Sequence, residues 1–217
     1  MKSRILIAIY TTTLATKCTD TLNTGATNPA RITLQQSLPV SAAAFSNGEP
    51  TFGSIDVALV AALRVTITEI EVLRLGEDDA DDTNPAWTRL ELTDPVELDF
   101  LALPLEGESP LVIASGELPL GSYGHVRLFV SSTGVEFASE VNVGPQTFYP
   151  ATLYEVEIPS GEQTGIKTNL RFDVTEDPGD VGLVFDPEAT FLNVVATGSG
   201  KVKLTPVVKG SAPPPNA

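Results

Sequence analysis

Apolar and polar residues alternate over short stretches of the chain, which is the period expected of a strand with one buried face. Leu63, Val65 and Ile67 form the apolar face of one such stretch. Ile70 and Val72 continue this face, but only after a change of phase. Since a slip of one residue would otherwise turn the apolar set outward, we predict a β-bulge or a strong bend in this strand.

Most of the remaining chain carries the same kind of signal. Turn residues such as glycine and proline separate the stretches at intervals of ten or so residues, as in an antiparallel sandwich. The helical signal is weak, with its best case at 55–62, where Ser54 is a candidate N-cap; this stretch fits the start of the long strand equally well. We expect an all-β, antiparallel β-sandwich of immunoglobulin or transthyretin-like type with little or no helix. Strands are predicted at 87–92, 96–103, 111–117, 123–131, 153–158, 165–174, 181–185, 190–196 and 201–208.

Composition narrows the classes of function. The 217 residues include 28 Asp and Glu against 13 Lys and Arg, for a formal charge of −15. Such a charge repels nucleic acid and anionic membrane surfaces, so neither is an expected partner. One Cys and one His exclude an internal disulfide and leave a Cys/His zinc site short of ligands. We predict no cofactor, apart from the calcium considered below.

The N-terminus has the pattern of an export signal. Lys2 and Arg4 precede an apolar stretch that begins at Ile5, is too short to span a bilayer and ends shortly before Cys18. A Cys in this place resembles the lipid-acceptor Cys of bacterial lipoproteins, although Lys17 occupies a position where such signals have a small residue. Three interpretations stay open: lipidation at Cys18, ordinary cleavage near residue 15, and retention of the segment as a first strand.

The chain then divides into four parts. Residues 1–18 form the signal-like segment, and the small polar residues 19–30 read as a linker. Residues 31–209 form a single β-sandwich domain, and 210–217 form a proline-rich tail.

Two loops carry candidate binding chemistry. The first places five carboxylates within six residues, and a bound Ca²⁺ ion would relieve the repulsion between them. The spacing is not that of an EF-hand, and a solvated hairpin loop explains the acidic residues as well. The second runs from 159 to 167, where polar side chains either bind a glycan or peptide or satisfy the backbone of the turn itself. The candidate residues are Glu77, Asp78, Asp79, Asp81 and Asp82 for calcium, and Ser160, Glu162, Gln163, Thr164 and Lys167 for the binding loop.

Two single residues, His125 and Trp87, are further candidates for a functional site. His125 shares a strand face with Tyr123, Arg127 and Phe129 in simple alternation, which places it on the outer face or rim rather than in a catalytic triad. Trp87 follows the acidic loop and is interpreted as a residue that fills the core rather than a platform for sugar stacking.

The order of motifs over residues 63–209 resembles an uncharacterised family of exported bacterial and archaeal lipoproteins with a β-sandwich domain of unknown function. The most specific part is the stretch Pro-Ser-Gly-Glu-Gln-Thr-Gly-Ile-Lys at 159–167. The resemblance implies a β-sandwich outside the cytoplasm and brings no activity or catalytic residue. Its other motifs lie at 65–72, 87, 96–101, 116–128, 184–186 and 203–207.

Three functions are therefore expected, in this order. The first is a non-enzymatic extracytoplasmic protein at the cell surface or in the periplasm, anchored by lipid, with a binding or structural role toward a glycan or protein. The second is a filament or surface-layer subunit that self-assembles by strand exchange, with the N-terminal segment or residues 31–38 as donor. The third is a hydrolase that uses two carboxylates.

Overall fold

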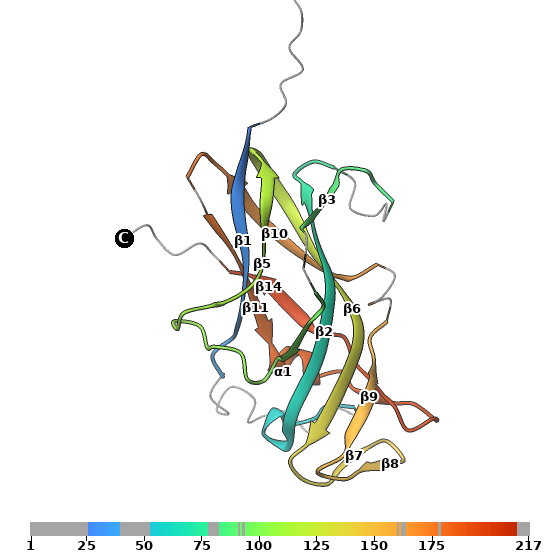
Figure 1. Cartoon of the computed structure of the whole chain (residues 1–217). Coiled ribbons are helices and arrows are strands. Elements are labelled where there is room, and N and C mark those ends of the chain that lie inside the picture. Colours follow the sequence, from blue (N-terminus) through green and yellow to red (C-terminus); the bar gives the residue numbers. More distant parts are fainter. Residues whose placement is uncertain are drawn as a thin grey trace, which may run out of the picture.

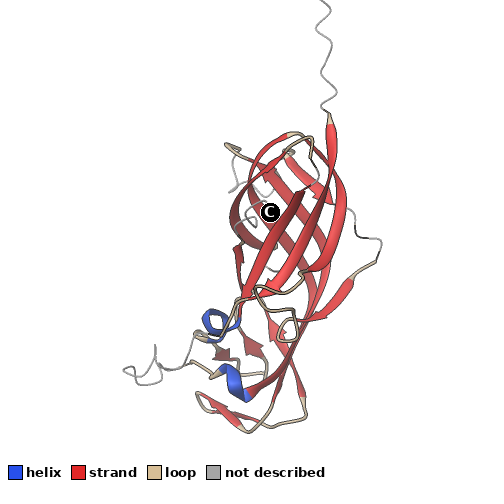
Figure 2. Ribbon diagram, turned by 90° about the vertical axis from the view of Figure 1, so that its left-hand side faces the viewer, coloured by secondary structure: helices blue, strands red, loops and turns tan. Residues whose placement is uncertain are grey.

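The computed structural model describes residues 26–39, 53–77, 83–90, 92, 94–159, 161, 164–177 and 179–211. Two sheets pack face to face, and strands curve around a common interior (Figures 1 and 2). The smaller sheet has the order β14-β11-β1-β5, from β14 (Val207–Gly210), β11 (Gly179–Asp186), β1 (Thr27–Gln36) and β5 (Leu111–Pro119).

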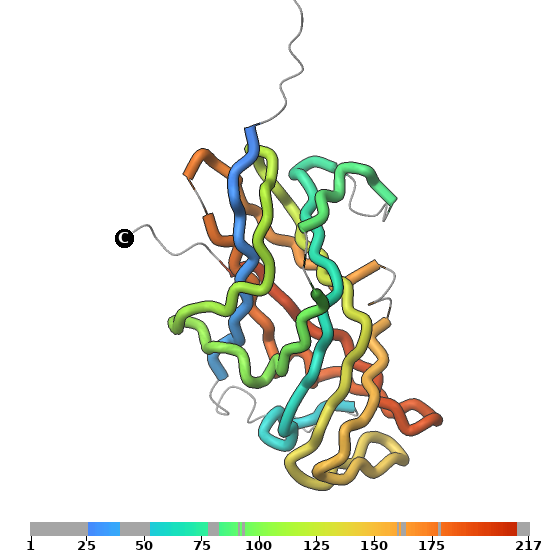
Figure 3. The backbone as a smooth tube through the Cα atoms, in the orientation of Figure 1, coloured from blue at the N-terminus to red at the C-terminus, as the bar shows by residue number. Residues whose placement is uncertain are grey.

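The larger sheet is built on two long strands, β2 (Val60–Arg74) and β6 (Gly121–Phe137), which run side by side along the molecule (Figures 1 and 3). A separate hairpin, β7 (Val141–Val143) with β8 (Gln146–Phe148), lies at one end. The other strands of the larger sheet are β3 (Trp87–Leu90), β4 (Val96–Asp99), β9 (Leu153–Glu157), β10 (Ile166–Val174), β12 (Val195–Ala196) and β13 (Val202–Lys203). The prediction of an all-β sandwich is confirmed.

Strand β1 occupies the middle of the smaller sheet, antiparallel to β5 and parallel to β11. Ile32 and Leu34 are fully buried in the core that the two sheets share. The strand begins at Thr27, so the last four residues of the expected linker belong to the folded body, and Gly210 of the expected tail likewise belongs to β14. The parallel pairings of β1 with β11 and of β13 with β9 differ from the wholly antiparallel sandwich expected.

Two β-bulges face each other in the long strands. Thr66 pairs with Ser132 and Ile67 with Val130, which leaves Ser131 of β6 without an opposite residue. The next pair is Glu69 with Phe129, so Thr68 of β2 is skipped in the same way. The predicted phase change in β2 is confirmed, because the bulge at Thr68 keeps the apolar residues on both sides of it in the core.

The outer neighbours of both long strands change at the level of these bulges. Along β2, the partner is β4 over 64–67 and β3 over 70–73. Along β6, the partner is β10 over 121–128 and β9 over 134–136. The larger sheet is therefore broken on both sides at one level, and this break positions the candidate site.

Aromatic side chains join the two sheets. Phe100, just after β4, meets Phe185 of β11 edge to face, with ring centroids 5.0 Å apart. Tyr123 of β6 is fully buried, and its hydroxyl donates a hydrogen bond to the Pro119 carbonyl at 2.8 Å. Burial raises the pKa of the Tyr123 hydroxyl, against the opposing charge of Arg74.

In the described ranges, helix is confined to two short segments, the 3₁₀ turn η2 (Val57–Leu59) and α1 (Pro187–Phe191). The stretch 55–62, predicted as either a short helix or the start of the long strand, contains both. A 3₁₀ turn capped by Asp56 instead of Ser54 is followed by the first residues of β2. The predicted strand 190–196 is wrong over most of its length, because Asp186 caps α1 there through a hydrogen bond from the Ala189 amide at 2.9 Å. Among the residues that the structure describes, no helix has the length and hydropathy to cross a membrane.

The position of β1 predicts that its core residues carry much of the stability. We expect Ile32→Ala to lower the free energy of unfolding by about 2–5 kcal/mol, because it opens a cavity between two fully formed sheets. Urea unfolding of the purified protein measures this. The matched control Leu38→Ala changes a side chain that is 56% exposed beyond the end of β1 and should have an effect within about 0.5 kcal/mol. Equal effects of the two variants would show that β1 is not integral to the core.

Candidate functional site

The break beside β6 opens the first of two neighbouring hollows on the larger sheet. Between the segments that pair with β10 and β9, residues 129–133 have no strand partner on that edge in the described part of the chain. One contact crosses the gap, from the Val130 amide to the Gly161 carbonyl at 3.2 Å. The cleft there has a volume of 430 Å³ and is lined by residues 130–133, 155–159 and 161.

A second hollow of 310 Å³ continues from the first across the outer face of the sheet. The two share Ser132, Thr133 and Glu155, and the second extends over Thr66 to Arg64 and Glu97. Ser132 donates to the Thr66 hydroxyl at 2.8 Å, so the bulge sets two hydroxyl groups side by side. We call the combined surface the polar band, consisting of Arg64, Thr66, Glu97, Ser131, Ser132, Thr133, Glu155 and Glu157.

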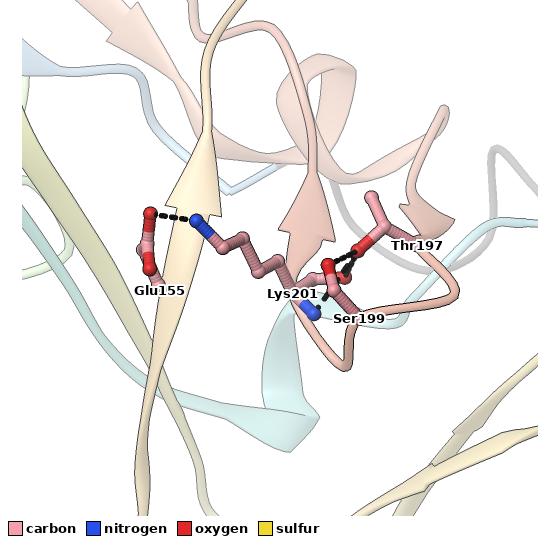
Figure 4. Close-up of polar contacts among 4 residues, drawn as sticks. All are labelled: Glu155, Thr197, Ser199 and Lys201. Atoms are coloured by element: carbon pink, nitrogen blue, oxygen red, sulfur yellow. Dashed lines mark hydrogen bonds and ion pairs between the residues drawn. The ribbon is translucent and has the colours of Figure 1, made fainter.

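Lysine side chains neutralise the carboxylates at one end of the polar band. Lys201 contacts Glu155, and Lys203 lies 3.3 Å from Glu157 (Figure 4 shows the first pair). Lys201 follows a turn in which Thr197 accepts a hydrogen bond from the Lys201 amide at 3.1 Å and contacts the Ser199 hydroxyl at 2.9 Å. These pairs bridge β9 and β13, which share only two residue pairs of backbone register. They are exposed, so each contributes little to stability and leaves polar atoms at the surface.

The predicted binding loop reaches this site only in part. Pro159 and Gly161 line the first cleft, whereas Lys167 lies on β10 in register with Arg127, beyond the gap. Thr164 is half-buried, and Gly165 has a φ of +71°, with the Leu128 carbonyl 3.0 Å from where a Cβ would sit. Gly165 thus has the left-handed backbone conformation and the close backbone approach that favour glycine. Ser160, Glu162 and Gln163 lie outside the described residues.

The calcium and lipid predictions concern residues that the structure mostly does not describe. Of the acidic loop only Glu77 is described, at an exposed position, and Asp78, Asp79, Asp81 and Asp82 lie outside. Within the described ranges, no three His, Cys, Asp or Glu side chains come together as metal ligands would. Cys18 lies outside as well, so both predictions stay open.

A buried ion pair forms a second polar cluster on the same outer face. Arg127 of β6 contacts Glu71 of β2 at 2.5 Å, and their side chains are only 6% and 14% exposed. The guanidinium lies 4.0 Å from the ring centroid of Trp87 and 4.9 Å from that of Phe129. We call these four residues the Arg127 cluster; the cation–π contacts add to an ion pair that is screened from water.

Glu69 borders the Arg127 cluster. Burial raises its pKa, and a hydrogen bond with Glu71 acts in the same direction, against the charge of Arg89, 3.0 Å away. A carboxyl whose pKa is raised on folding favours the folded state while it is protonated. This contribution is present in full below the pKa of the unfolded chain and is lost as the pH rises through the folded value.

The positions of His125, Trp87 and Tyr123 agree only in part with the predictions from the sequence. His125 lies on the outer face as predicted, and its Nδ1 is 2.9 Å from the Asn169 side-chain oxygen. Trp87 is buried as predicted, but beneath Arg127 on the outer face instead of in the main core. The placement of Tyr123 beside His125 is wrong, because Gly124 is skipped in the register with β2 and Tyr123 turns into the core.

The two polar surfaces differ in what they can do chemically. In the Arg127 cluster, the guanidinium is occupied by Glu71 and by the rings of Trp87 and Phe129, so this cluster stabilises the sheet. The polar band offers hydroxyl groups, carboxylates and the Arg64 guanidinium, and none of the described residues that line its two hollows is aromatic. It can therefore recognise a polar ligand by hydrogen bonds and not by ring stacking.

Sequence reasoning missed the residues of the polar band. The signal was the run Ser131-Ser132-Thr133, which begins at the last residue of the predicted strand 123–131 and ends its alternation. A bulge explains such a run, because it lets consecutive side chains face solvent. Glu155 and Glu157 alternate with buried Val156, so they read as ordinary outward residues until their neighbours in space are known.

The Arg127 cluster generates a stability prediction. We expect Arg127→Met to lower the free energy of unfolding by about 3–5 kcal/mol, because it leaves the Glu71 carboxylate buried without its partner. The double variant Arg127→Met with Glu71→Leu should recover much of this loss. Urea unfolding measures both. The control is Arg64→Met, whose exposed contact with Glu97 is 3.9 Å long and should matter by less than about 1 kcal/mol. A double variant as unstable as Arg127→Met would contradict the unpaired-charge explanation.

Comparison with known proteins places the domain in a family. No curated protein and no solved structure gives a significant match. A family model described as a domain of unknown function, DUF4382, matches residues 54–206, which include β2 to β13 and both helical segments. Strands β1 and β14 lie outside the matched range, although β1 is central to the smaller sheet. The match covers well over half of the chain, which therefore belongs to this family of domains of unknown function.

Proposed function

We propose that the protein is a non-enzymatic binding protein of the cell exterior, anchored by lipid at Cys18 and binding a polyhydroxylated ligand such as a glycan in the polar band. The observation that carries the binding role is the pair of adjoining hollows, which share Ser132, Thr133 and Glu155. Their hydroxyl groups and ion-paired carboxylates match the donors and acceptors of a sugar ring.

A binding role fits the carboxylates of the polar band better than a catalytic one. Glu155 and Glu157 face outward on β9, with side chains 64% and 51% exposed, and each is paired with a lysine. A general acid in a glycosidase needs a carboxyl held protonated by an apolar surrounding. The surroundings of these two groups are charged and open to water instead of apolar.

The anchoring role rests on the sequence pattern and on where the fold begins. Strand β1 starts at Thr27, so only a short polar segment separates Cys18 from the folded body. A lipid at Cys18 would thus hold the sandwich close to the membrane. The net charge of −15 opposes direct contact with anionic headgroups and favours a body that stands off the surface.

The strand-exchange alternative gains no support from the described residues. Residues 31–36 of the proposed donor pair with β5 and β11 of their own chain. The other proposed donor, the N-terminal segment, lies outside the described residues.

The anchoring proposal predicts the effect of removing the Cys18 thiol. When the gene is expressed in a bacterium that processes lipoproteins, an alkyne-bearing fatty acid should label the wild-type protein and not Cys18→Ser. Cys18→Ser should also move from the membrane fraction to the soluble fraction or keep its uncleaved N-terminus. Equal labelling of both, or an intact Met1 on the wild-type protein, would contradict lipid anchoring.

The binding proposal predicts where a sugar contacts the protein. Linear hexasaccharides of glucose and of N-acetylglucosamine are suitable probes for NMR titration of the isotope-labelled mature protein. The amide shifts should concentrate at Thr66, Ser132 and Glu155, and Ser132→Tyr, which fills the cleft, should weaken binding about tenfold or more. The control Thr147→Tyr adds the same ring to the β7–β8 hairpin and should bind as the wild type does. Shifts confined to the smaller sheet, or no shifts with either sugar, would argue against glycan recognition by the polar band.

A further inference from the structure

The sandwich is closed along one side and open along the other. On the closed side, β10 of the larger sheet meets β14 of the smaller one, and Thr168 donates to the Val208 carbonyl at 3.0 Å. On the opposite side, β5 ends the smaller sheet and pairs only with β1 among the described strands. A groove of 590 Å³ separates the first half of β5, at residues 112–115, from the segment that leads into β4.

One wall of this groove is the outer edge of β5, which carries no charge over residues 111–115. The described lining on this side is Val112 to Ser115 of β5, and Val112 is 47% exposed. Residues 111–115, Leu-Val-Ile-Ala-Ser, include no charge and no proline, two of the features that protect an edge from pairing with another chain. A bulge at Ile113, which is skipped in the register with β1, bends the edge within this stretch. Five residues of edge extend roughly 16 Å, enough for a short strand to add.

The other wall is acidic. Asp94 and Glu97 line it together with Leu92, Pro95 and Val96, and no Lys or Arg is among the described residues of the groove. Glu97 has only a weak exposed contact with Arg64, at 3.9 Å. A strand placed in the groove would therefore have unpaired β5 backbone on one side and carboxylates on the other.

The acidic charge of the groove and of the whole chain distinguishes two occupants, a second copy of this chain and a basic segment of another protein. A second copy of this chain would bring another net charge of −15. Antiparallel pairing of two β5 edges would also bring together Glu108 and Glu117, which flank the exposed part of each strand. Like charges in this arrangement oppose pairing, whereas a basic segment would be attracted to the groove.

We propose that the groove between β4 and β5 binds an extended, basic peptide segment of a partner protein, which adds as a strand to the free edge of β5. Backbone hydrogen bonds to β5 supply the affinity, and Asp94 and Glu97 select for Lys or Arg side chains. This surface is separate from the polar band apart from Glu97, which borders both. The proposal stands whether or not the polar band binds a glycan.

The test uses a fluorescein-labelled ten-residue peptide in which Val alternates with Lys, with fluorescence anisotropy of the mature protein as the readout. A peptide of the same charge, N-methylated at alternate backbone amides, separates strand pairing from charge attraction. A peptide with Glu in place of Lys tests the sign of the charge. We expect the first peptide to bind, the N-methylated one to bind about tenfold or more weakly, and the Glu peptide not to bind measurably.

Protein variants locate the binding. Asp94→Asn with Glu97→Gln removes the acidic wall, and Val112→Lys puts a like charge on the edge; each should weaken binding about tenfold. The control Glu176→Gln with Asp177→Asn removes the same charge from the exposed turn between β10 and β11 and should leave binding within about twofold. Circular dichroism confirms that each variant is folded. Absence of binding, equal binding of the N-methylated peptide, or an equal effect of the control pair would overturn the proposal.

Discussion

The opposing bulges at Thr68 and Ser131 are the constraint on which the larger sheet depends. Each long strand has a continuous apolar face on both sides of its bulge, and the extra residue lets the strand bend without turning that face outward. The outer neighbours of β2 and β6 change at this level, since no single short strand follows the bend. The first cleft of the polar band lies where β9 and β10 separate, so the bend that shapes the core also creates the surface site.

The smaller sheet depends on β1, a strand that lies outside the family match. β1 lies between β5 and β11, yet it precedes the part of the chain that the family model matches. Its side chains are tied to β11 by the Arg31–Asp180 pair at 2.6 Å and to the loop before β5 by Gln35, whose amide donates to the Glu108 carbonyl at 2.7 Å. Strand β1, which lies between the expected anchor and the family domain in the sequence, is therefore an integral part of the fold.

Much of the fold could be predicted from the sequence, and the failures have identifiable causes. Alternation located most strands and the bulge in β2, because burial of one sheet face imposes it directly. It misplaced Tyr123, because a bulge at Gly124 reverses the phase, and it missed α1, where the Asp186 cap and Pro187 outweigh the strand propensity of the following residues. The sequence did not reveal the polar band, because its hydroxyl groups and carboxylates come from β2, β4, β6 and β9, which only strand pairing brings together.

The central claim is that the polar band faces the cell exterior on a lipid-anchored protein. Labelling with a small, membrane-impermeant maleimide tests it most directly, because Cys18 is the chain's only cysteine and Ser132 is exposed in the polar band. Lipid on the Cys18 thiol predicts no labelling of the wild-type protein, even after denaturation, and full labelling of Ser132→Cys in intact cells. Labelling of the denatured wild-type protein, or of Ser132→Cys only after the cells are lysed, would contradict the account.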